Sequence, residues 1–136
     1  MSENSLTLVN NEIENSGIYF SLNAEDEESK KILFRAMQAA DKAVGDCINN
    51  TINLKDVYIS KTDIVDKETG EVSKAHYIVL IDADGTSYGC VSKGIFNSLR
   101  HLMVVYGAPT WNEPLKVVIK QRTINDGHKL TYLDLA

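Results

Sequence analysis

Three turns that contain glycine divide the C-terminal two thirds of the chain, and they constrain its fold more than any other feature. These turns centre on Gly70, Gly85 and Gly127. The segments around them are rich in β-branched and aromatic residues, as strands are. They run over 54–65, 75–81, 86–91, 115–122 and 129–135. The segment AHYIVLI is apolar throughout, which is typical of a strand covered on both faces or of a barrel wall. The pattern predicts a series of hairpins.

Two amphipathic helices are predicted around these strands. In the first, Asn23 is the expected N-cap, the carboxylates at 25–28 fall in the first turn, and apolar residues recur at helical spacing as far as Val44. In the second, Ser92 is the expected N-cap and Gly107 ends the helix. This second helix interrupts the series of strands between the third and the fourth.

The order from residue 52 onward is therefore β-β-β-α-β-β, in a chain of the α+β, mainly β class. Five strands with one helix after the third predict an OB-like barrel over 52–136, a fold that binds oligonucleotides or oligosaccharides. An open α+β sheet would have the same order. Residues 1–51 form a predicted N-terminal extension with the first helix and short edge strands at 5–9 and 17–22.

The charge of the chain does not exclude a nucleic-acid partner. The formal net charge is −5, from 14 Lys and Arg and 19 Asp and Glu. Residues 1–30 hold seven of the acidic side chains and a single lysine, whereas 115–132 hold four basic side chains and one acidic. Because net charge describes solubility and long-range steering, it leaves room for a local anion-binding surface. The N-terminus lacks the features of a signal peptide and no apolar run has the length of a membrane span, so we expect a cytoplasmic protein with no membrane partner.

No pattern in the sequence supports catalysis. The string DADG at 82–85 resembles the start of a calcium loop, but Lys93 stands where that loop needs glutamate, and turn chemistry explains the string. Cys47 and Cys90 read as small core residues. The three histidines are scattered, and no phosphate-binding loop or nucleophile elbow is present. We therefore expect no enzyme activity, no metal and no cofactor.

The segment 115–122 offers a candidate surface for single-stranded nucleic acid. Lys116, Lys120 and Arg122 are separated by even numbers of residues, so they point to one face of a strand. Such a surface needs cations for phosphates and rings for bases. Further candidate residues on the predicted sheet and its loops are Tyr58, Lys61, Tyr77, Tyr88 and Trp111. The alternatives are that the lysines are solvated, that the tyrosines belong to the core, and that Trp111 packs against the second helix.

Residues 79–135 resemble the single-stranded DNA-binding proteins of small tailed phages that infect Gram-positive bacteria. The resemblance lies in the D-x-D-G hairpin, the Y-x-x-V-S strand end, the helix that ends in Y-G-x-P, and the strands that contain P-L-K-V and L-T-Y-L-D-L. It implies a protein that coats and protects single strands during phage DNA replication, with little sequence preference and no cofactor. The binding residues that it implies are Tyr88, Lys93, Lys116, Lys120, Arg122, Lys129 and Tyr132.

Two other functions fit parts of the sequence. An acidic phage protein that inhibits a host DNA-binding protein would present the carboxylates at 25–28. A small carbohydrate- or peptide-binding barrel would have the same strand order. For the DNA-binding reading, the candidate partners besides single-stranded DNA are replication proteins and a second copy of the chain, which could meet the apolar side of the first helix.

Overall fold

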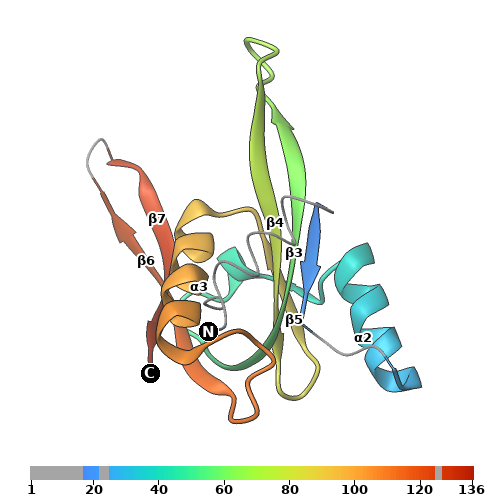
Figure 1. Ribbon diagram of the computed structural model, residues 1–136. Coiled ribbons are helices and arrows are strands. Elements are labelled where there is room, and N and C mark those ends of the chain that lie inside the picture. The colour runs from blue at the N-terminus through green and yellow to red at the C-terminus, as the bar shows by residue number, and fades with distance from the viewer. Residues whose placement is uncertain (1–16, 22–24, 125–126) are drawn as a thin grey trace, which may run out of the picture.

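The computed structural model describes residues 17–21, 25–124 and 127–136, which form a curled mixed β-sheet with two α-helices (Figure 1). The chain is mainly β, as the sequence predicts, and the curled sheet is compatible with an OB-like fold. The elements in order are β1 (Ile18–Phe20), α2 (Glu27–Gln38), β2 (Lys42–Ala43), a 3-10 turn (Val44–Asp46), β3 (Thr51–Val65), β4 (Val72–Asp82), β5 (Ser87–Cys90), α3 (Lys93–Tyr106), β6 (Leu115–Thr123) and β7 (Lys129–Leu135).

The sheet is organised around the long strand β3. Its order is β2-β5-β4-β3-β6-β7, and β1 also pairs with β3. One edge of β3 pairs with β4, while the other pairs with β6 through 51–54 and with β1 through 58–60. A register shift between Leu54 and Asp56 marks a bulge, which bends the strand where its partner changes. Within the described residues β5 and β7 are not neighbours, so the sheet is an open half-barrel.

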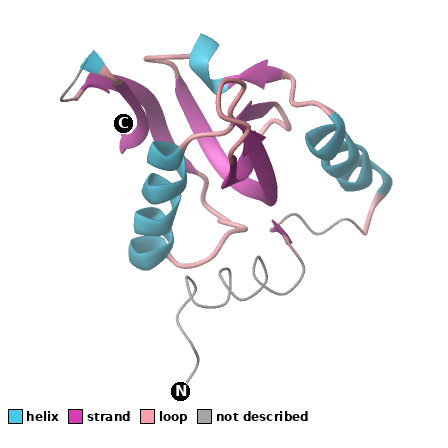
Figure 2. Cartoon of the chain, turned by 90° about the horizontal axis from the view of Figure 1, so that it is seen from above, coloured by secondary structure: helices cyan, strands magenta, loops and turns pink. Residues whose placement is uncertain are grey.

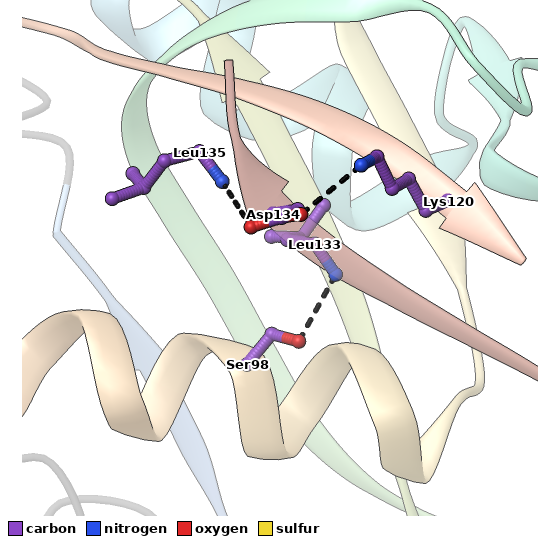
Figure 3. A network of polar contacts seen from close by, with 5 residues as sticks. All are labelled: Ser98, Lys120, Leu133, Asp134 and Leu135. Atoms are coloured by element: carbon purple, nitrogen blue, oxygen red, sulfur yellow. Dashed lines mark hydrogen bonds and ion pairs between the residues drawn. The ribbon is translucent and has the colours of Figure 1, made fainter.

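Helix α3 lies along the free edge of β7. The backbone N–H of Leu133 donates to Ser98 Oγ at 3.0 Å (Figure 3), and the Ser92 hydroxyl donates to the Thr131 carbonyl at 3.5 Å. Both backbone groups belong to the strand at the end of the sheet, where a row of such groups would otherwise invite pairing with another chain. Ser98 of α3 and the N-cap Ser92 therefore bond two backbone groups of β7 that a further strand would otherwise pair with.

The two helices lie on opposite sides of the sheet (Figures 1 and 2). On the concave side, Ile95, Leu99 and Met103 of α3 are buried against the strands. Trp111 joins this core with 6% of its surface exposed, and its Nε1 donates to the carbonyl of Gly107 at 3.1 Å. The prediction that Trp111 packs against the second helix is thus confirmed. On the outer side, α2 packs against β3, β4 and β5 through a smaller apolar cluster.

The predicted bounds of the first helix are wrong at both ends. Asp26 is the N-cap, because its carboxylate accepts the backbone N–H of Ser29 at 2.7 Å, and this bond lowers the pKa of Asp26. Asn23 and the predicted strand at 5–9 lie outside the described residues. The helix ends at Gln38 because the chain then runs beside β5, where Lys42 pairs with Tyr88.

The N-terminal strand, the caps of α3 and the turns agree with the predictions from the sequence. The strand expected at 17–22 is present as β1, and Ser92 and Gly107 cap α3 as predicted. The three turn glycines have positive φ angles, which residues with a side chain rarely adopt. The turn reading of DADG is confirmed, because Asp82 accepts the N–H groups of Asn53 and Asp84, and Asp84 accepts that of Thr86.

A buried carboxylate, that of Asp56, ties the N-terminal strand to the loop after α3. Asp56 is 2% exposed and accepts hydrogen bonds from the hydroxyls of Ser21 and Thr110 on one oxygen. Ser21 Oγ in turn accepts the backbone N–H of Val57 at 2.9 Å. The network closes around the bulge in β3, so it links three segments that are distant in the sequence.

We expect Asp56→Ala to lower the free energy of unfolding by about 2 kcal/mol, because two part-buried hydroxyls lose their acceptor. Asp56→Asn should cost less, since its amide oxygen can still accept. Urea unfolding followed by tryptophan fluorescence measures both. Asp46→Ala, at an exposed position, is the control. An Asp56→Ala variant as stable as this control would show that the network adds nothing to stability.

Candidate nucleic-acid interface

Strand β6 separates its apolar and basic residues onto opposite faces. Val117 and Ile119 point into the core and are fully buried, whereas Lys116 and Arg122 are exposed and the Lys120 side chain is 42% exposed. This alternation is the two-residue period of a strand with one face on the core. The predicted arrangement of the three cations on one face is confirmed.

Strand β7 adds a ring to the same face. Tyr132 stands opposite Lys120 in the ladder, and residues directly opposite one another share a face. The guanidinium of Arg122 lies 5.6 Å from the centre of the Tyr132 ring, within the range of a cation–π contact. We call this surface the cationic face; its members are Lys116, Val118, Lys120, Arg122 and Tyr132. Lys129 stands opposite Thr123, one position out of phase, so the register puts it on the other face.

One carboxylate competes for this face. Asp134 accepts a hydrogen bond from Lys120 Nζ at 3.1 Å and one from the backbone N–H of Leu135 at 2.9 Å (Figure 3). The bond from Lys120 is the main reason why the pKa of Asp134 is lowered, so this carboxyl is ionised at neutral pH. Asp134 therefore neutralises part of the charge that Lys120 could offer to a phosphate.

We expect Asp134→Asn to strengthen binding of an oligothymidylate about two- to fivefold at low salt, because it frees Lys120 and removes a negative charge beside the phosphates. The gain should shrink as salt rises, since exposed charges are screened. Glu28→Gln removes the same charge on α2 and should leave affinity unchanged. Equal affinities for the Asp134→Asn variant and the unmodified chain would argue against a phosphate at Lys120.

Four candidate aromatic residues lie away from the cationic face. Tyr58, Tyr88 and Trp111 are less than a tenth exposed, and burial raises the pKa of the Tyr88 phenol. Tyr77 is half-buried at the outer cluster, in an edge-to-face arrangement with Tyr58 at a centroid distance of 6.5 Å. Three of these rings are too buried to stack on a base, and Tyr77 packs in the cluster that α2 covers, so we leave all four out of the proposed surface. The three tyrosines are on strands whose two sides are packed by α2 and α3, and Trp111, in the loop between α3 and β6, is buried in the main core.

Lys61 and Lys93 lie on the side of the sheet that α3 covers. Lys61 stands opposite His76 on the face of β3 and β4 that continues from buried Ile59 and Ile78, and Lys93 is the first residue of α3. A hollow of about 540 Å³ lies between the β3–β4 hairpin and the start of α3. Its lining includes Lys74, His76 and Phe96, which the sequence analysis did not select. The register of β3 and β4 sets the face on which Lys74 and His76 lie, but their contact with Phe96 depends on how α3 packs against the sheet.

The described part of the chain also holds a largely buried thiol, that of Cys90. Burial raises the pKa of Cys90 to about 12, so its thiol stays protonated and unreactive at neutral pH. Among the described residues, no group of three or more His, Cys, Asp or Glu side chains could hold a metal ion. None of the described helices is long and apolar enough to cross a membrane.

Comparison with known proteins gives a family match over most of the chain. The family described as Phage Single-stranded DNA-binding protein matches residues 13–136. No curated protein and no solved structure matches the chain.

Proposed function

The chain belongs to the family of phage single-stranded DNA-binding proteins, and we propose that it coats and protects single strands during phage DNA replication, without sequence preference. This role involves no catalysis and no cofactor. We expect the protein to act in the cytoplasm of the infected host cell.

The cationic face is the observation that supports a DNA contact in this part of the chain. Lys116, Lys120 and Arg122 spread their charges over about 20 Å, at about 3.3 Å per strand residue. Three spaced cations on an exposed strand can follow a phosphate backbone, which has the same chemistry for every sequence. Tyr132 adds a half-buried ring beside Arg122 on which a base can stack.

The OB-like architecture supports the same proposal. OB-folds bind oligonucleotides with the help of the hairpin loops after their first and fourth strands. The β3–β4 and β6–β7 hairpins stand at the corresponding places in the strand order, and both project upward in Figure 1. The cationic face belongs to the second of these hairpins.

A titration with an oligothymidylate at 50 mM and 200 mM salt tests the function. We expect tight binding at low salt that weakens as salt rises, with a duplex of the same length bound far more weakly. Fluorescence of Trp111 and the tyrosines and a gel shift report binding independently. An absence of any gel shift at micromolar protein and low salt would overturn the proposal.

A further inference from the structure

A second feature of the molecule is a hollow lined by aromatic and basic side chains, the residue types that contact the base and the phosphate of a nucleotide. The hollow of about 540 Å³ lies between the start of α3 and the β3–β4 arm, by which we mean residues 61–76 of that hairpin. Its volume is within the usual range for small-ligand sites, about 300–1,000 Å³. We propose that it takes one unstacked base of the bound single strand, while Lys74 and Lys93 contact the neighbouring phosphates. The inference rests on the proposed function.

Two aromatic rings line the hollow in a fixed arrangement. His76 of the arm and Phe96 of α3 are stacked with their centroids 4.3 Å apart and their planes 2° from parallel. Phe96 also packs against the main core, and this contact holds the pair of rings in place. Beside the rings, Ile64 and Val91 are about half exposed. Rings held in place and apolar groups open to solvent suit the flat, apolar surface of a base.

The charges at the hollow suit the rest of the nucleotide. Lys74 comes from the arm and Lys93 from the first turn of α3, and both are exposed. Lys74 pairs with Asp63 at 3.3 Å, but the two side chains are 84% and 55% exposed, and ion pairs so exposed contribute little to stability. A phosphate can therefore take the place of Asp63. Two cations beside the stacked rings favour a nucleotide over an apolar peptide as the occupant.

The hollow is distinct from the cationic face. The arm presents to α3 the face that continues from Ile59 and Ile78 of the core, whereas Lys116, Lys120 and Arg122 point away from the core. Each surface can therefore be altered without touching the residues of the other. This separation lets the two contributions be measured one at a time.

The first test uses two oligonucleotides of equal length, an oligothymidylate and one whose sugars carry no bases. The ratio of their affinities measures what the bases contribute. We expect Phe96→Leu, which keeps an apolar side chain, to lower this ratio about tenfold, and His76→Leu to lower it as well. Thermal unfolding checks that each variant is folded, and the His76 variant, whose site is on the arm, serves if loss of Phe96 disturbs the core.

The second test removes the charges. Lys74→Gln with Lys93→Gln should weaken both oligonucleotides in parallel and reduce the slope of log affinity against log salt by about 1.4. The matched control is Lys30→Gln with Lys31→Gln, on α2, which should change neither quantity. If the unmodified protein binds both oligonucleotides equally well, or if the Phe96 and His76 variants keep the full ratio, the inference is overturned and the proposed function stands. If the unmodified protein binds neither, the proposed function itself fails.

Discussion

Replacing Lys116, Lys120 and Arg122 together by glutamine should weaken oligothymidylate binding roughly a hundredfold at low salt, at about 1 kcal/mol for each charge. The physical reason is the loss of three contacts that displace counterions from the strand. The slope of log affinity against log salt should become shallower by about 2, since each phosphate contact on a single strand contributes about 0.7. Fluorescence titrations between 50 and 300 mM salt measure both quantities.

A matched variant separates local charge from net charge. Lys30, Lys31 and Arg35 of α2, replaced by glutamine, change the net charge by the same amount on a helix that packs against β3, β4 and β5 and not against β6 and β7. This control should keep nearly the whole affinity and slope. The altered strand residues point to solvent, so the thermal midpoint of the first variant should stay within a few degrees of that of the unmodified protein. An unchanged salt slope in the first variant would remove the cationic face from the binding surface.

Gly94→Ala should destabilise the fold more than an added methyl group at any other described glycine. Gly94 is the second residue of α3, where the helix meets β7, and a Cβ placed there would lie 2.0 Å from the backbone oxygen of Thr131 and 2.8 Å from Leu130 Cδ1. A strand backbone cannot give way as a side chain can, so α3 must shift away from β7. We expect a loss of about 2–3 kcal/mol in the free energy of unfolding, despite the better helix propensity of alanine.

Gly45→Ala is the matched control for this experiment. No atom lies within 4 Å of a Cβ built at Gly45, so the same added methyl should change stability by less than about 0.5 kcal/mol. Thermal unfolding should show the Gly94 variant melting about 10 °C lower, given roughly 3–6 °C for each kcal/mol in a domain of this size. A Gly94 variant as stable as the Gly45 variant would contradict the close contact between α3 and β7.

Strand alternation and turn chemistry could be predicted well because they are local. The two faces of β6 follow from the spacing of Lys116, Lys120 and Arg122, and the glycines at 70, 85 and 127 mark their turns without reference to the rest of the fold. The end of α2 could not be predicted in this way. Residues up to Val44 keep helical spacing, but the backbone at Lys42 pairs with Tyr88 of β5 instead, and this pairing depends on residues 46 positions later in the chain.

The sequence by itself determined the mainly β class, the order of the strands from β3 to β7, the capping of α3 and the placing of three cations on one strand face, since each depends on neighbouring residues alone. Only the tertiary structure decided which rings are open to solvent. Tyr58 and Tyr88 have the same strand spacing as exposed residues, and they are buried because helices pack over both sides of their strands. The tertiary structure likewise decided that Phe96 meets His76 at a hollow, because a contact between a helix and a hairpin is set by how the sheet curls and not by any spacing along the chain.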